Sequence, residues 1–158
     1  MRRLTPGVAL LSTIGLACHV HYAAYASQAS GDARAFANAE GAYERWTGAY
    51  GTPDCLRDPT GCVPGEKLPR LFDLGAQDQA NPGYTYKFYP GPVRSTPGAV
   101  PAPPRLDGFA FVARPVEWGG LTKRAFCADA TGGVFFTTDP ETPDPAGGAC
   151  PATWSALK

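Results

Sequence analysis

The five cysteines have the clearest chemical potential in this sequence: Cys18 lies in an apolar run near the N-terminus, and the other four lie further along the chain. An even set of cysteines outside the N-terminal segment is typical of a disulfide framework in an exported protein. We expect Cys55 to pair with Cys62 because the two are close in sequence. We expect Cys127 to pair with Cys150 for the same reason, although four cysteines allow three connectivities. Free thiols or zinc ligands are the alternatives, and the lack of C-x2-C spacing disfavours zinc.

A second group with potential chemistry is the acidic, proline-rich stretch near the C-terminus, which carries Asp139, Glu141 and Asp144. Carboxylates at this spacing could hold calcium together with backbone oxygens. A solvated acidic loop is the alternative that we favour, so we expect no metal site. His19 and His21 are two residues apart and would point to different faces of a helix, so we do not expect them to share a metal.

No familiar catalytic motif occurs in the sequence: G-x-S-x-G, H-E-x-x-H, the P-loop and G-x-G-x-x-G are all absent. Both histidines lie near the N-terminus, which leaves none in the body of the chain for a Ser-His or Cys-His pair. The tetrapeptide starting at Asp129, Asp-Ala-Thr-Gly, differs by one inserted residue from the Asp-Thr-Gly of aspartic proteases, and a hairpin turn explains it. We therefore expect a protein that is not an enzyme and takes no cofactor.

Composition predicts one exported domain. The chain has 158 residues, a formal net charge of zero and 14 scattered basic residues, so nothing suggests a nucleic-acid partner. Its 19 glycines and 17 prolines predict long loops. Arg2 and Arg3 precede an apolar run, as they do in a secretory signal or in the cytoplasmic flank of a membrane anchor. We divide the chain into an anchor or signal segment, residues 1–26, and a head, residues 27–158.

Three fates are open to the N-terminal segment. Residues 8–26 would span about 28 Å as a helix, close to the hydrocarbon thickness of a bilayer of about 30 Å. Cleavage after Ala26 fits the small-x-small pattern of a signal peptidase site. Lipidation of Cys18 would explain the odd fifth cysteine. We favour a retained inner-membrane helix, with a lipoprotein or a secreted protein as the alternatives.

The reason for this preference is a heptad pattern that crosses both cleavage sites. It predicts one long helix, membrane-bound at its start and amphipathic at its end, in which Asp32 is the only ionised position. A cleaved signal peptide followed by a short surface helix is the alternative. The other positions of the pattern are Val8, Leu11, Gly15, Cys18, Tyr22, Tyr25, Ala29, Phe36, Ala39, Tyr43, Trp46 and Tyr50.

The rest of the chain predicts a small antiparallel sheet. Gly48 to Gly51 should end the helix, and four short segments then show alternating or apolar strand patterns: 83–89, 108–114, 124–128 and 133–138. We expect residues 52–82 to form a loop region with one helical turn at 68–74, and residues 90–106 to be extended without a partner. The tail, residues 139–158, should be held only if Cys150 reaches Cys127. The inward-facing residues expected on the first two strands are Tyr84, Tyr86, Phe88, Phe109, Phe111 and Ala113. The fold class is α+β, a long N-terminal helix packed on about four strands, with Phe36, Ala39, Tyr43 and Trp46 covering the sheet.

Several of these segments together resemble type IV pilin-like and pseudopilin-like proteins of Gram-negative bacteria. The resemblance lies in the long helix, its Gly-x-Tyr-Gly end at 48–51, the strand at 83–88, Phe-x-Ala-x-Pro at 111–115, Gly120, and the hairpin Arg-Ala-Phe-Cys-Ala-Asp-Ala-Thr-Gly-Gly-Val at 124–134. It implies a helix packed on an antiparallel sheet, an inner-membrane anchor with a periplasmic head, and assembly through the helices with other pilin-like subunits. The implied role is structural, in a type IV pilus or a type II secretion-like machine. A periplasmic or lipid-anchored binding module built on the same head is the alternative.

The resemblance also implies a processing site at the N-terminus. Family members are cut between Gly and an apolar residue, and Gly7 followed by Val8 fits that pattern, with Arg2 and Arg3 upstream. The fifth residue of the processed chain would be Ser12, where the family carries Glu. The sequence therefore resembles a divergent member of the family.

Overall fold

A computed structural model describes residues 12–63, 65–94, 104–119 and 123–158, with side chains from residue 23 onward. Helices precede strands along the chain, as expected for an α+β protein. The described elements are α1 (Ser12–Thr47), α2 (Pro53–Arg57), α3 (Pro59–Cys62), α4 (Leu74–Ala80), β1 (Tyr84–Pro90), β2 (Phe109–Pro115), β3 (Ala125–Asp129), β4 (Val134–Thr137) and β5 (Ser155–Ala156).

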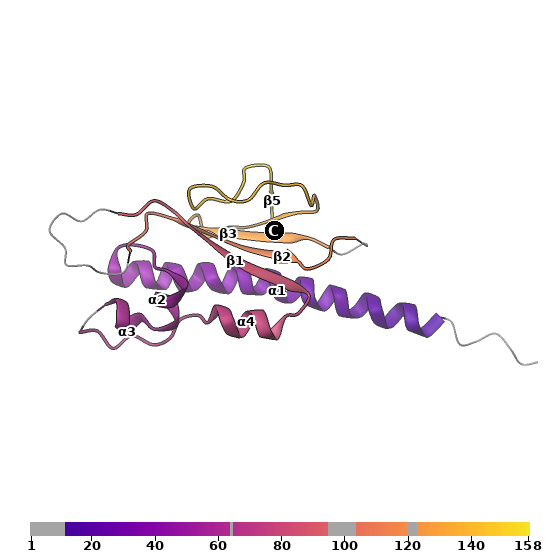
Figure 1. Cartoon of the computed structure of the whole chain (residues 1–158), viewed down its shortest axis with the longest axis horizontal. Helices are drawn as coiled ribbons and strands as arrows, with labels where there is room; N and C mark the ends of the chain where they lie inside the picture. Colours follow the sequence, from indigo (N-terminus) through magenta and orange to yellow (C-terminus); the bar gives the residue numbers. More distant parts are fainter. Residues whose placement is uncertain (1–11, 64, 95–103, 120–122) are drawn as a thin grey trace, which may run out of the picture.

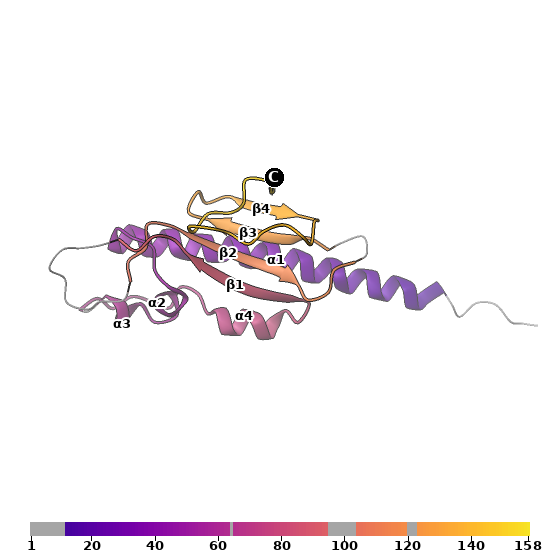
Figure 2. The same cartoon turned by 45° about the horizontal axis from the view of Figure 1, so that its top comes forward.

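The strands form one antiparallel sheet in the order β1-β2-β3-β4-β5, and Figure 2 shows β1 to β4 side by side across α1. The meander of four strands agrees with the sequence analysis, but the expectation of about four strands omitted β5. Ser155 and Ala156 pair with Phe136 and Phe135 at the edge of β4. A strand of two residues is too short to show the alternating pattern that identifies strands in a sequence. It forms here because the tail reaches the edge of β4.

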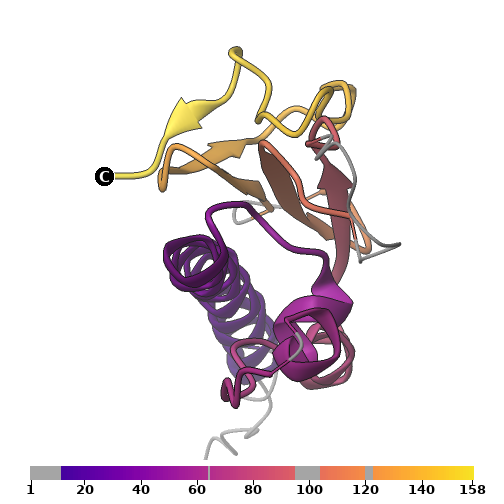
Figure 3. The ribbon, with the colours of Figure 1, turned by 90° about the vertical axis from the view of Figure 1, so that its left-hand side faces the viewer.

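The sheet packs on α1 through an aromatic core, and Figure 3 shows α1 on one side of the sheet and the C-terminal segment on the other. Phe36 is fully buried at the centre of this core. Its ring stacks on Phe111 with 4.2 Å between ring centroids, and Phe72, Phe88 and Phe109 lie between 5.1 and 5.8 Å. Ala39 and Tyr43, about one and two helical turns further along, are buried in the same core, so the expected cover of the sheet by Phe36, Ala39 and Tyr43 is present.

The prediction that Trp46 covers the sheet was wrong. Trp46 is 48% exposed, whereas Ala33 and Glu40 are fully buried and Asp32 is half-buried. The buried line therefore runs through positions 29, 33, 36, 40 and 43. The heptad positions 29, 36, 39 and 43 are buried as expected, but α1 is rotated so that 33 and 40, not 32 and 46, lie deepest.

The second face of the sheet is also buried. Ala110 and Val112 on β2, with Ala125 and Cys127 on β3, pack under Trp154 of the C-terminal segment. The disulfide between Cys127 and Cys150 ties this segment to β3, which is the condition under which the sequence analysis expected the tail to be held.

The connecting segments differ most from expectation. Residues 52–82 hold three short helices, and the helix expected at 68–74 instead starts at Leu74, where Asp73 Oδ1 accepts a hydrogen bond from the Ala76 amide. The segment after β1 was expected to lack partners, yet Leu106 pairs with both Tyr50 and Val93. Main-chain carbonyls exposed at a helix end need donors, and this pairing brings arginines to the end of α1.

Candidate functional site

The helix exit, where α1 leaves the sheet, is the candidate site. Figure 1 shows the N-terminal part of α1 extending past the strands and short helices. Ala23, Ala24 and Ser27 are exposed, and full burial begins at Ala29. The same helix therefore belongs to the core at one end and projects from the head at the other.

A chain of hydrogen bonds fixes the direction in which α1 leaves the head. Asn81, fully buried after α4, donates through Nδ2 to the Tyr25 carbonyl over 3.1 Å and to the Tyr86 hydroxyl over 2.9 Å. Tyr86 on β1 in turn donates its hydroxyl to Asp32 Oδ2 over 2.6 Å. This network joins α1, the end of α4 and β1 at one point, which resists rotation of the projecting helix.

The protonation of this network is set by burial. Burial raises the pKa of Asp32, and the hydrogen bond from Tyr86 partly opposes that effect. Burial, followed by the nearby Asp32 carboxylate, raises the pKa of Tyr86 well above its usual value. Tyr86 is therefore a neutral hydrogen-bond donor at neutral pH, which suits a positioning role better than nucleophilic chemistry.

Two hollows of about 310 Å³ each lie beside the helix exit. One lies between Tyr25 on α1, Pro82 before β1 and Val116 after β2. The other follows α1 from Ala23 to Ser30 and reaches β3. These hollows leave room for a neighbouring molecule on both sides of the projecting helix.

The opposite end of α1 is capped by arginines. Gly48 adopts the left-handed conformation with φ +74°, which ends the helix as the sequence predicted. Arg94 donates to the Gly48 carbonyl and Arg105 donates to the Thr47 carbonyl. Cationic groups at a helix C-terminus stabilise the helix dipole, so this end of α1 is firmly held in the head.

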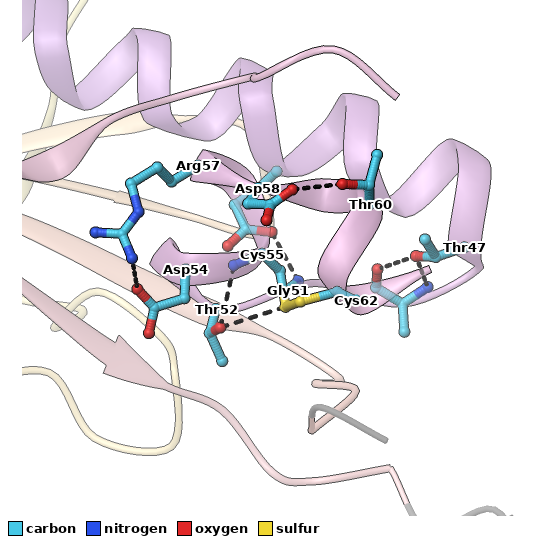
Figure 4. Close-up of a disulfide and its surroundings, with 11 residues drawn as sticks. Thr47, Gly51, Thr52, Asp54, Cys55, Arg57, Asp58, Thr60 and Cys62 are labelled. Atoms are coloured by element: carbon cyan, nitrogen blue, oxygen red, sulfur yellow. Dashed lines mark hydrogen bonds and ion pairs between the residues drawn. A yellow bond between two sulfur atoms is a disulfide. The ribbon is translucent and has the colours of Figure 1, made fainter. Parts of the chain in front are cut away.

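The disulfide lobe, residues 51–63, follows this capped end along the chain and packs beside α1 (Figure 4). Cys55 and Cys62 form a disulfide, the pairing expected from their proximity in sequence. Thr52 caps α2 by accepting from the Cys55 amide over 3.4 Å. The lobe is joined to α1 by the Gly51 amide, which donates to Glu40 Oε2 over 2.9 Å.

Glu40 is an unusual member of the α1 core. Its side chain is fully buried, and its second oxygen, Oε1, has no hydrogen-bond partner. Burial raises the pKa of Glu40 to about 8, and the hydrogen bond from Gly51 only partly opposes that rise. Glu40 is therefore mostly protonated at neutral pH.

The carboxylates considered for calcium do not gather around a site. Asp139 Oδ1 accepts from the Glu141 amide over 2.9 Å in a local turn. Asp144 forms two ion pairs: its Oδ1 lies 3.0 Å from Arg114 Nη2, and its Oδ2 lies 3.4 Å from Lys87 Nζ. A hydrogen bond from Tyr89, together with these cations, lowers the pKa of Asp144. Within the described ranges, no group of three His, Cys, Asp or Glu side chains could hold a metal ion.

The turn at Asp129, the near-match to a protease motif, has a structural use. Asp129 Oδ1 accepts from the Thr131 amide over 3.0 Å, as expected for a hairpin turn. Its other oxygen, Oδ2, accepts from the Cys150 amide over 3.0 Å. This carboxylate fastens the C-terminal segment beside the second disulfide.

The residues proposed for N-terminal processing lie beyond what the structure describes. Gly7 and Val8 fall outside the described residues, and Cys18 lies within α1 at a position whose side chain is not described. In the portion of the chain that is described, no helix combines the length and the apolarity needed to cross a bilayer.

Comparisons with protein-family models, with curated proteins and with solved structures find no match for this chain.

Sequence reasoning missed Asn81 and Glu40. Asn81 contacts Tyr25 and Tyr86 across the fold, and nothing in its local sequence signals those contacts. A signal for Glu40 did exist, because it follows Ala33 and Phe36 at helical spacings of seven and four.

Proposed function

We propose that this protein is a non-enzymatic, pilin-like subunit of a bacterial envelope, anchored in the inner membrane with its head in the periplasm. The observation that supports this proposal most is α1, which serves at once as the core helix of the head and as a rod projecting from it. A helix of 36 residues is about 54 Å long, well beyond what a head of this size needs for its core. Its projecting end is available to a membrane or to a neighbouring subunit.

The helix exit favours a structural role over a catalytic one. The network of Asn81, Tyr86 and Asp32 holds the helix in one direction, and the hollows beside it can accept another subunit. The head is braced by two disulfides, as suits a protein outside the cytoplasm. Its work in this proposal is to assemble with, or dock to, pilus or secretion machinery through side-by-side helices.

The N-terminus of the protein purified from membranes tests the proposal. Pilin-type processing produces a chain that starts at methylated Val8, and Gly7→Leu should block this cleavage while Cys18→Ser leaves it unchanged. A diacylated Cys18 would instead support the lipid-anchored binding module. A chain that starts at Ser27 would show a secreted protein, and an intact Met1 would contradict pilin-type processing.

Assembly is tested separately by photo-crosslinking. A photoreactive amino acid at Ala23, on the projecting part of α1, should yield crosslinked oligomers in membranes. The same amino acid at Trp46, which is exposed on the part of α1 within the head, is the matched control and should yield few. Equal crosslinking at the two positions would contradict assembly through the projecting helix.

A further inference from the structure

The contact between Glu40 and Gly51 is a buried hydrogen bond that joins the start of the disulfide lobe to α1, beside the apolar packing of Cys55 and Leu56 in the core. α2 and α3 have five and four residues, too few for a helix to be stable without tertiary contacts. Cys55 and Leu56 are the buried residues of α2. The Gly51 amide, donating to Glu40 Oε2 over 2.9 Å, is the first bond of the lobe after the end of α1.

The lobe is also coupled to the aromatic core. The Leu56 carbonyl accepts from the amides of Leu71 and Phe72, over 2.9 and 3.3 Å. Phe72 contacts Phe36 edge to face, with 5.1 Å between the ring centroids. Movement of the lobe would therefore reach the centre of the head.

The protonated form of Glu40 is much less costly in these surroundings than the ionised form. A buried carboxylate needs a cation or several donors, and Glu40 has one amide donor and an unpartnered Oε1. A neutral carboxyl carries a far smaller desolvation penalty in the same place. Loss of the proton therefore leaves a poorly compensated charge between α1 and the lobe.

The titratable groups around Glu40 do not supply that compensation. On α1, Tyr43 and Glu44 are the neighbours along the helix, and Tyr50 follows the helix end. Glu40 raises the pKa of both Tyr43 and Tyr50, behind the larger effect of burial, and Glu44 acts on Tyr50 in the same direction. Arg105, from the segment before β2, lowers the pKa of Tyr43 but donates its hydrogen bond to the Thr47 carbonyl.

The inward-facing residues of α2 add no ionisable group, because Cys55 is in a disulfide and Leu56 is apolar.

We propose that Glu40 is a proton-controlled fastener: its neutral carboxyl holds the disulfide lobe against α1, and its ionised form loosens the lobe. This inference does not depend on the proposed function, because it concerns the head alone.

The pH range follows from the sign of the shift. The pKa of Glu40 is about 8 in the closed lobe and about 4.5 once the side chain is solvated, so the closed form binds the proton more tightly. The fastening is complete below the lower value and weakens as pH rises toward 8. Between pH 5.5 and 8.5, linkage predicts an increase in lobe opening of about 200-fold.

Amide hydrogen exchange of the full chain at pH 5.5 and 8.5, corrected for intrinsic exchange, tests the proposal. We expect protection in residues 51–63 to fall about 200-fold between these pH values. Glu40→Gln keeps an oxygen for the Gly51 amide but cannot ionise, so its lobe protection should not vary with pH. Glu44→Gln, one helical turn further along α1, is the matched control and should behave like the original protein.

An equal pH-dependent loss of lobe protection in Glu40→Gln would overturn the proposal. If that variant does not fold, carbon-13 NMR of the glutamate carboxyls in the unmodified protein supplies the second measurement. One carboxyl that titrates near pH 8 supports the fastener. Titration of every glutamate below pH 6 overturns it.

Discussion

Replacement of Phe36 by alanine is the sharpest test of how α1 and the sheet form one core. Phe36 is fully buried, stacks on Phe111 and meets Phe72, Phe88 and Phe109 at ring-centroid distances below 6 Å. Deletion of a buried phenylalanine ring typically costs about 3 to 5 kcal/mol. Because several aromatic contacts are lost together, we expect about 4 kcal/mol or more for Phe36→Ala.

The matched control is Trp46→Ala on the same helix. The heptad pattern gave Trp46 and Phe36 equal standing as core positions, but Trp46 is 48% exposed. A half-exposed ring at the surface should contribute only about 1 kcal/mol. The two substitutions therefore separate the observed rotation of α1 from the one that the heptad pattern predicted.

Urea unfolding followed by far-ultraviolet circular dichroism measures both free energies of unfolding, and this signal does not depend on the tryptophan that the control removes. The midpoint should fall much further for Phe36→Ala, with the slope unchanged in both variants. If Phe36→Ala does not fold, Phe36→Leu should still lose more stability than Trp46→Ala. Equal losses at the two positions would refute the packing of α1 described here.

The sheet and the main helix could be predicted because their side-chain patterns have a regular period. Tyr84, Tyr86 and Phe88 alternate on β1 with polar residues, and the first two are buried against α1 as expected. Phe109 and Phe111 on β2 continue the same layer. In such segments the apolar residues recur on one face, so the sequence predicts which face is buried.

The rotation of α1 was harder to predict because alanine carries little information. Ala29, Ala33, Ala37 and Ala39 are all buried, so the apolar pattern fits more than one choice of the inward line. The heptad pattern placed Ala39 and not Glu40 on the inward line, although a carboxyl can be buried in its neutral form. The protonation state, which sequence patterns omit, was the missing information.

Much of the helix exit and the tail could not be predicted because their contacts are distant in sequence. Asn81 and Tyr25 are 56 residues apart, and the bond between them exists only after α4 and β1 have packed on α1. β2 showed the same difficulty in another form: Ala110 and Val112 are buried as well as Phe109 and Phe111, because the C-terminal segment covers the second face. The pairing of Cys127 with Cys150 was the one sequence signal that linked this segment to the sheet.

Two further predictions concern the disulfides of the head and the packing of the C-terminal segment. Replacing both cysteines of the bridge at Cys150 by alanine should lower the stability of the head by about 3.4 kcal/mol, and replacing both cysteines of the bridge at Cys62 should lower it by about 2.5 kcal/mol. The first bridge costs more because it closes a longer loop, and thermal unfolding of the two variants tests this order. The last prediction concerns Gly148, whose φ is +74° and where an added Cβ would lie 2.5 Å from Gly91 Cα. Gly147 has φ +60° with nothing within 4 Å, so Gly147→Ala should lose only the left-handed preference, about 1 kcal/mol. Gly148→Ala loses the same preference and in addition forces two backbone segments apart, so its free energy of unfolding should fall well below that of Gly147→Ala. Equal losses in urea unfolding would show that the segments do not cross in contact at this point.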